Sequence, residues 1–330
     1  MEIAKALILT GRGRDDGRCP NSSNEPRHLF PVANRPLLFH NLASLRAAGV
    51  LETTILTDAA TAGVVETAVG DGRDWGLSVR YAMWEPDSGV AGAVAAGREF
   101  VRDEPVLVQQ GDALLRERLH PHVSSFARER LDALALQLQQ PAAEAVPLSM
   151  PWYLLSPKAI SVLGDAGRPD ANPVTGVQAQ GGRVRVQLVD GCMPCRGDVD
   201  GLLESNRSLL EHLQPSVDPA SVEESRIQGA VEIHPTAKVR RSIVRGPAII
   251  GPGAEITDAY IGPYSSIGAG VVVEGSEIEY SIVLPEAELR FIGTRLESSV
   301  IGRRARIVRE FRNPQAIRMS VGDGAEVVLT

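Results

Sequence analysis

Residues 8–38 begin as an apolar strand and run into a loop of the kind that binds phosphate. Gly11, Gly13 and Gly17 could form a turn whose backbone N–H groups approach a phosphate closely. Charged side chains stand between them, where such a turn usually has small residues: Arg12, Arg14, Asp15, Asp16 and Arg18. A carboxylate about 4 Å from a phosphate would be repelled by roughly 4 kcal/mol at an effective dielectric near 20, unless Mg²⁺ or an arginine screened it. The loop is therefore either a phosphate-binding turn of unusual composition or a solvated loop with ion-paired arginines.

A second short motif, C-M-P-C at Cys192 and Cys195, could be a redox pair or half of a zinc site. A complete zinc site needs two more ligands. Cys19 is the one other thiol of the chain, and the distant candidates among the histidines are His28, His40, His120 and His122. Three cysteines also make no disulfide framework. The sequence favours two reduced thiols without a chemical role.

The pattern of apolar residues predicts a parallel α/β sheet that would position the loop. Apolar runs of strand length alternate with segments of helical periodicity, which indicates right-handed βαβ crossovers. The expected strands are residues 3–10, 53–57, 77–82, 106–110 and 151–156, and the expected helices are residues 36–48, 60–69, 91–101 and 198–213. No clear pattern is present from 113 to 150. Ligands of such sheets bind beyond the carboxyl ends of the strands, where Gly11 and Asp112 both fall.

The C-terminal part of the chain contains the strongest regularity of the sequence. Aliphatic residues recur at spacings of five or six, so that every third one is 17 residues from its starting point. They are Ile233, Val239, Val244, Ile250, Ile256, Ile261, Ile267, Val273 and Ile278. This period is typical of a triangular solenoid, in which each short strand forms one side and directs one aliphatic residue inward. The pattern is identified as the hexapeptide repeat of left-handed β-helices.

Composition and charge limit the classes of function. The chain has 330 residues, of which 43% are hydrophobic and 23% charged, and a net charge of −7. This is typical of a globular protein with two domains, without a basic field that would bind a nucleic-acid polymer or an anionic membrane. No run of about 18 apolar residues could span a bilayer, and we expect a cytoplasmic protein. The Pro- and Ser-rich stretch 214–222 is interpreted as a linker, which gives expected domains at 1–215 and 216–330.

Several segments carry a resemblance to a known family. They are Lys5-Ala-Leu-Ile-Leu9, Pro31-Val-Ala-Asn-Arg-Pro-Leu37, Gly89-Val-Ala-Gly-Ala-Val94, Gly111-Asp112, Asp200-Gly-Leu-Leu-Glu-Ser-Asn-Arg207 and Ile256-Thr-Asp-Ala-Tyr-Ile-Gly-Pro-Tyr264. The chain resembles the sugar-1-phosphate nucleotidyltransferases, above all the long form of glucose-1-phosphate thymidylyltransferase. The resemblance implies a Rossmann-like α/β nucleotidyltransferase domain with a mostly parallel sheet, followed by a left-handed parallel β-helix.

The resemblance also implies a reaction. In this family an oxygen of a sugar 1-phosphate attacks the α-phosphorus of an NTP in line, and pyrophosphate leaves. The protein must hold two polyanions together, which requires backbone N–H donors, a basic residue at the phosphates and carboxylates for Mg²⁺. For this chain the resemblance implies Mg²⁺ as the cofactor, with dTTP and glucose 1-phosphate as substrates.

The family's motifs imply roles for particular residues. Arg27 takes the place of a lysine that contacts the phosphates, and Asp112 matches the first metal carboxylate. Arg18 or Arg14 would stabilise the leaving pyrophosphate. The residues expected at the nucleotide are Leu9, Thr10, Gly11, Gly13 and Gly89, together with Trp84 where the family has a base-reading glutamine. Asn172 stands in the sugar-binding motif in place of a glutamate.

Two departures from the family leave the function open. Cys195 aligns with the second metal carboxylate, and a neutral thiol is a poor Mg²⁺ ligand. The family's sugar-phosphate-binding E-K-P segment has no counterpart in residues 113–150. The chain is therefore an NDP-sugar-forming enzyme, a catalytically degenerate relative with a regulatory, scaffolding or binding role, or a relative whose cleft serves another reaction on a phosphorylated or nucleotide-bearing substrate. We expect a homo-oligomer, because the open end and flat sides of the solenoid need covering.

Overall fold

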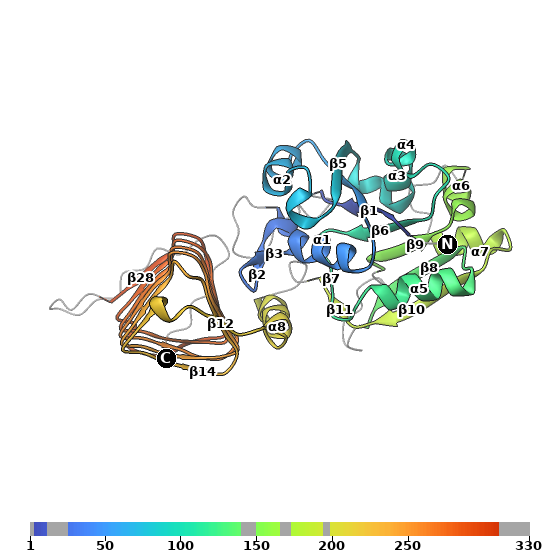
Figure 1. Cartoon of the computed structure of the whole chain (residues 1–330). Helices are drawn as coiled ribbons and strands as arrows, with labels where there is room; N and C mark the ends of the chain where they lie inside the picture. Colours follow the sequence, from blue (N-terminus) through green and yellow to red (C-terminus); the bar gives the residue numbers. More distant parts are fainter. Residues whose placement is uncertain (1–2, 12–25, 140–149, 166–172, 194–198, 310–330) are drawn as a thin grey trace. The chain divides into compact units, whose positions relative to one another are not determined.

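The computed structural model describes residues 3–11, 26–139, 150–165, 173–193 and 199–309 (Figure 1). They form two compact units, named here for their main elements. The α/β unit contains the described residues of 1–18, 26–29 and 37–193, and the β-helix unit contains those of 30–36 and 194–330. A domain boundary between residues 215 and 216 stays a prediction.

A seven-stranded sheet forms the centre of the α/β unit (Figure 1). Its strands lie in the order β10-β8-β9-β6-β1-β4-β5, and all neighbouring pairs are parallel except the two that involve β9. They are β1 (Lys5–Leu9), β4 (Glu52–Thr57), β5 (Ser78–Met83), β6 (Val106–Gln110), β8 (Ala133–Leu138), β9 (Trp152–Leu155) and β10 (Val184–Val189). The predicted, mostly parallel α/β sheet is confirmed.

Apolar clusters cover both faces of this sheet, because successive side chains of a strand point to opposite faces. On β1, Ala6 and Ile8 belong to one cluster and Leu7 to the other. Helices α1, α2 and α5 contribute to the first cluster, and α3, α4, α6 and α7 to the second. Their bounds are α1 Leu37–Ala47, α2 Ala62–Val69, α3 Gly89–Ala96, α4 Arg98–Val101, α5 His120–Glu129, α6 Pro157–Asp165 and α7 Pro173–Ala179. The unit therefore has three layers, with helices on both sides of the sheet.

The α/β unit also contains elements that the sequence pattern did not predict. Residues 113–150 contain α5 and β8, and α6, α7 and β10 were likewise missed. The single helix expected over 91–101 is two helices, α3 and α4, that meet at Gly97. A Cβ atom at Gly97 would lie 2.7 Å from a methyl carbon of Leu7, so a larger residue would collide with β1 there.

Three parallel sheets form the sides of a triangular stack in the β-helix unit (Figure 1). Each strand pairs with the strand one coil further along, as Ile250 does with Ile233 and Ile267. All nine aliphatic residues of the repeat are buried, with at most 1% of each residue exposed. The predicted left-handed β-helix, with these residues in its core, is confirmed.

The strands of the β-helix are short and follow one another from side to side. The first side contains β12 Ser216–Val217, β15 Val231–Ile233, β18 Ala248–Ile250, β21 Ser265–Ile267, β24 Ile282–Val283 and β27 Val300–Ile301. The second contains β13 Val222–Glu223, β16 Lys238–Arg240, β19 Glu255–Thr257, β22 Val272–Glu274, β25 Glu288–Arg290 and β28 Arg306–Val308. The third contains β14 Arg226–Gln228, β17 Ile243–Arg245, β20 Tyr260–Ile261, β23 Glu277–Glu279 and β26 Leu296–Glu297. The hairpin β2 (Pro31–Val32) and β3 (Arg35–Pro36) and the helix α8 (Val199–Leu210) complete this unit.

The stretch 214–222 belongs to the first coil, so its interpretation as a linker is wrong. Strand β12 lies within this stretch and pairs with β15 of the next coil. Strand β13 begins at its last residue and pairs with β16. Between them Pro219 begins the 3-10 turn Pro219–Ser221, which Asp218 caps by accepting a hydrogen bond from the Ala220 amide. The proline and serine residues therefore form a corner of the solenoid. This corner has the same composition as a linker.

Candidate active site

The carboxyl ends of β1, β4 and β6 meet at one edge of the α/β sheet, where hydrogen bonds join them. Thr10 donates to the Leu56 carbonyl from its amide at 2.8 Å and from its hydroxyl at 2.9 Å. The Gly111 amide donates to the carbonyl of Leu9, the last residue of β1, at 2.9 Å. From α1, the Asn41 side-chain amide donates to the Gly111 carbonyl at 3.0 Å. The residues that follow these three strands are thereby brought to one place.

Arg27 and Asp112 form a buried ion pair at this edge. Arg27 Nε lies 3.6 Å from Asp112 Oδ2, and the two side chains are 5% and 7% exposed. Arg27 begins the short 3-10 helix η1 (Arg27–Leu29). A 2.8 Å hydrogen bond from the Leu29 amide to the Pro26 carbonyl closes this turn. Two residues predicted for different roles, the basic residue at the phosphates and the metal carboxylate, therefore lie together.

His28, in the same turn, is a buried imidazole. The sequence offered it only as a distant candidate zinc ligand, and its place at this edge was not predicted. Its Nε2 atom has no hydrogen-bond partner among the described residues. Removal from water lowers the pKa of His28 from 6.5 to about 4, while the charges of Asp112 and Asp58 act in the opposite direction and that of Arg27 acts in the same direction. His28 is therefore neutral at physiological pH.

Asp58 is the second acidic residue near this edge, and it was also missed. It directly follows β4, as Asp112 follows β6 after one glycine, so the same strand-end signal could have found it. Asp58 Oδ1 accepts hydrogen bonds from the Ala60 amide at 3.1 Å, the Thr61 amide at 2.8 Å and the Thr61 hydroxyl at 2.7 Å. These bonds hold the start of α2 and occupy one oxygen of the carboxylate.

The residues predicted to bind the nucleotide include three neighbours at the end of β1. The Trp84 indole Nε1 donates to the Thr10 carbonyl at 3.3 Å. Gly11 lies so close to Pro86 that a Cβ atom would be 2.6 Å from its Cγ. Gly89 begins α3 with a φ of 60°, in the left-handed region that favours glycine. Thr10 and Gly11 at the end of β1 thus meet the chain that follows β5.

Other residues singled out in the sequence lie outside the described part of the chain: Gly13, Arg14, Arg18, Cys19, Asn172 and Cys195. Cys192 is described and lies in β11 (Gly191–Cys192), which pairs antiparallel with β7 (Leu114–Leu115).

The described side chains around Asp112 fit a Mg²⁺ ion that is held together with a phosphate ligand. Mg²⁺ is usually bound by one or two carboxylates and completes its shell with water and substrate phosphates. Asp112 offers such a carboxylate. Within the described ranges, no group of three His, Cys, Asp or Glu residues could hold a metal ion by itself.

No helix in those same ranges is long and apolar enough to cross a membrane.

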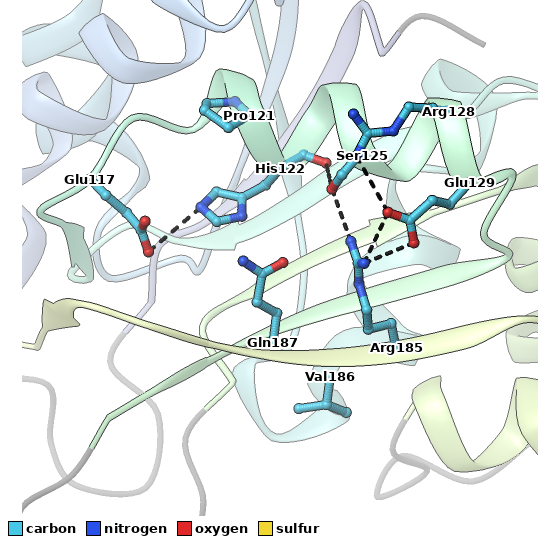
Figure 2. Close-up of a pocket in the computed structure, with 9 residues that line it drawn as sticks. All are labelled: Glu117, Pro121, His122, Ser125, Arg128, Glu129, Arg185, Val186 and Gln187. Atoms are coloured by element: carbon cyan, nitrogen blue, oxygen red, sulfur yellow. Dashed lines mark hydrogen bonds and ion pairs between the residues drawn. The ribbon is translucent and has the colours of Figure 1, made fainter.

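A separate groove of about 430 Å³ lies between α5 and β10 (Figure 2). Its charged groups pair with one another, since Arg185 donates to the two carboxylate oxygens of Glu129 at 3.0 and 2.8 Å, and His122 Nε2 lies 3.6 Å from Glu117 Oε1. Two strands, β8 and β9, lie between β10 and β6, and no residue that the sequence predicted for the site lines the groove. We interpret it as an ion-paired surface groove outside the candidate active site.

Similarity to known proteins extends over both units. Residues 5–145 match the family model described as nucleotidyl transferase. Glucose-1-phosphate thymidylyltransferase of Streptomyces griseus is 32% identical over 97% of this chain and 98% of its own length. The enzyme of the same name from Streptomyces antibioticus is 29% identical over 98% of this chain and 99% of its own.

A solved structure from Bacillus anthracis, described as a glucose-1-phosphate thymidylyltransferase in complex with sucrose, has a TM-score of 0.53 to this chain. It covers 64% of this chain and 97% of that one at 20% sequence identity, which shows the fold alone.

Proposed function

The chain belongs to the sugar-1-phosphate nucleotidyltransferases that include glucose-1-phosphate thymidylyltransferase, and we propose that it joins an NTP to a sugar 1-phosphate, forming an NDP-sugar and releasing pyrophosphate. The observation that carries this proposal is the 32% identity to one such enzyme over 97% of the chain. The buried pair of Arg27 and Asp112 supports it, because sheets of this kind bind their ligands beyond the carboxyl ends of their strands.

In this proposal the nucleotide lies against the end of β1. Gly11 has no side chain, so the backbone beside Leu9 and Thr10 can approach the phosphates. Gly13 and Gly89 would supply further backbone contacts. Trp84, whose indole is held at 3.3 Å by the Thr10 carbonyl, would contact the base in place of a glutamine.

Arg27 is the proposed basic residue at the reacting phosphates. Its guanidinium is almost completely buried, and a charge in a site of low dielectric acts more strongly on a developing negative charge than one in water. His28 stays neutral beside it and adds no second cation. The proposal extends to residues 14, 18 and 172, with Arg14 or Arg18 at the leaving pyrophosphate and Asn172 at the sugar.

Mg²⁺ is the proposed cofactor, and Asp112 would hold it together with the phosphates of the substrate. Bound Mg²⁺ would neutralise negative charge on the phosphates. The nearby Arg27 guanidinium orients the Asp112 carboxylate by their ion pair. For the substrates we propose dTTP and glucose 1-phosphate, the chemistry that the names of the Streptomyces relatives indicate.

The proposal is tested by incubating the full chain with each of the four common NTPs and a panel of hexose 1-phosphates, with and without Mg²⁺, and measuring released pyrophosphate. We expect release that requires both substrates and Mg²⁺ and is fastest with dTTP and glucose 1-phosphate. Absence of release with every pair would contradict the proposal. Release that is fastest with another pair would retain the reaction and replace its substrates.

A catalytically degenerate relative, or a cleft converted to another reaction, is not favoured by similarity that extends over nearly the whole chain. Homo-oligomerisation and a cytoplasmic location remain parts of the proposal. Sedimentation of a single species at the chain mass of 35.3 kDa would contradict the first of these.

A further inference from the structure

The hairpin β2–β3 begins four residues after Arg27 and has an unusual turn. Pro31 pairs with Pro36 and Val32 with Arg35, which leaves Ala33 and Asn34 as a two-residue loop. Both loop residues have positive φ, 49° and 56°. Asparagine tolerates this left-handed conformation, but alanine does so rarely, so the turn requires support from outside the hairpin.

Asn206 of α8 provides that support. The Ala33 amide donates to Asn206 Oδ1 at 2.9 Å, and the Ser266 hydroxyl donates to the same oxygen at 2.6 Å. Asn206 Nδ2 in turn donates to the Tyr264 carbonyl at 3.0 Å. Asn206 is fully buried, and its bond with the Ser266 hydroxyl is shielded from water, while the bonds with Ala33 and Tyr264 are partly buried. One amide side chain therefore joins the turn to a coil of the β-helix.

A second bond attaches the turn to the same coil. The Asn34 side-chain amide donates to the carbonyl of Ile267, the last residue of β21, at 2.6 Å. Both loop residues are thus bonded to the β-helix unit, one through its backbone and one through its side chain. The hairpin is a fixed part of that unit.

The chain on either side of the hairpin carries residues of the candidate active site. Before it lies η1, with Arg27 paired to Asp112. After it lies α1, whose Asn41 donates to the Gly111 carbonyl, next to Asp112. The segment that contains Arg27 is therefore held at Asp112 on one side and, a few residues along the chain, at the hairpin.

We propose that Asn206 is a positioning residue for the nucleotidyl transfer: by fixing the Ala33–Asn34 turn to the β-helix, it holds the adjoining η1 turn in the conformation that keeps Arg27 beside Asp112. This inference rests on the proposed function of Arg27. An amide is suited to the role because it accepts two hydrogen bonds on one atom and donates from the other. Aspartate cannot donate to the Tyr264 carbonyl, and alanine makes none of the three bonds.

The test compares Asn206→Ala with the milder Asn34→Gly, which retains the left-handed turn and loses only the bond to Ile267. Ser205→Ala is the matched control, because Ser205 is buried in the same helix and bonds to the Gly201 carbonyl four residues earlier. We expect kcat to fall about tenfold or more in Asn206→Ala and less in Asn34→Gly, with Ser205→Ala at the wild-type rate. In an Arg27→Gln background, Asn206→Ala should cause no further loss, because the two residues act through one contact.

Amide hydrogen exchange gives a readout that does not depend on activity. In Asn206→Ala the hairpin amides of Val32, Ala33, Asn34 and Arg35 should exchange at least about tenfold faster, and so should the Leu29 amide, which closes η1. Unchanged exchange at Leu29 would overturn the inference whatever the activity. Additive losses in the double variant would also overturn it and leave the function of Arg27 in place. Wild-type rates in Arg27→Gln would instead show that the proposed role of Arg27 is wrong, and the positioning role would fail with it.

Discussion

Replacement of His28 by glutamine tests the electrostatic account of the candidate site through the stability of the α/β unit. Burial lowers the pKa of His28 to about 4 in the folded chain, from an ordinary value of 6.5 for a solvated histidine. As the pH falls below 6.5, the unfolded chain takes up a proton that the folded chain cannot, so the free energy of unfolding decreases. The contribution of the neutral imidazole is therefore present at high pH and is lost between pH 6.5 and pH 4.

The difference between the two pKa values fixes the size of this effect. At about 1.4 kcal/mol for each pH unit, the shift from 6.5 to about 4 corresponds to a total loss of about 3 kcal/mol, of which about 2 kcal/mol is lost by pH 5. Glutamine does not titrate, so His28→Gln should remove this part of the pH dependence. Any change in packing adds an offset that is the same at every pH.

Urea unfolding followed by tryptophan fluorescence measures the effect, because Trp75, Trp84 and Trp152 all lie in the α/β unit. In Mg²⁺-free buffer, wild type should lose about 2 kcal/mol more than His28→Gln between pH 8 and pH 5. A difference between the two proteins that stays constant over this range would refute the assignment of a neutral, buried His28. A smaller loss in wild type than in the variant would do the same.

Three further predictions concern packing and the groove. Ile256→Ala removes a fully buried side chain from the β-helix core and should destabilise that unit by about 2–5 kcal/mol, measured by thermal unfolding in circular dichroism. Gly92→Ala should lower the thermal unfolding temperature of the α/β unit although alanine favours helices, because its Cβ would collide with the Ser88 side chain. The double change with Ser88→Gly should recover most of the loss, and no recovery would locate the strain elsewhere. Arg185→Met breaks the pair with Glu129 in the groove and should leave pyrophosphate release at the wild-type rate, whereas a large loss would place the groove in the active site.

The sequence was sufficient to predict the β-helix because its period is carried by one kind of residue. Each coil needs an aliphatic side chain on every side, so Ile233, Ile250 and Ile267 recur in a register that no other fold requires. The corner residues were not recognisable in the same way. Pro219 and its neighbours have the composition of a linker, and only strand pairing with the next coil distinguishes the two.

The pairing of Arg27 with Asp112 was partly predictable from the sequence, but several elements of the α/β unit were not. Asp112 could be placed because the ends of parallel strands share one edge of the sheet, and this rule applies equally to Asp58. Helix α5 was missed because it begins with His-Pro-His, and its buried apolar side chains are limited to Val123 and Phe126.

No local sequence pattern predicts the role of Asn206. It bonds to residues 60 and 173 positions away in the sequence, so nothing near it in the chain indicates its partners. Tertiary contacts of this kind become visible only in the folded structure.

Formation of an NDP-sugar by wild type, Asp112→Asn and Asp190→Asn is the most direct test of the central claim. Asp190 is a matched control, because it also directly follows a strand of the sheet, β10, and pairs with an arginine, Arg116, at 3.2 Å. With dTTP, glucose 1-phosphate and Mg²⁺, wild type and Asp190→Asn should form the NDP-sugar and pyrophosphate at equal rates. The NDP-sugar is detected by mass spectrometry and the pyrophosphate by an enzymatic assay. Asp112→Asn should lower kcat/KM by about 100-fold or more while its circular dichroism spectrum stays that of wild type. Equal rates in the two variants would contradict a catalytic site at the edge of the sheet formed by Arg27 and Asp112.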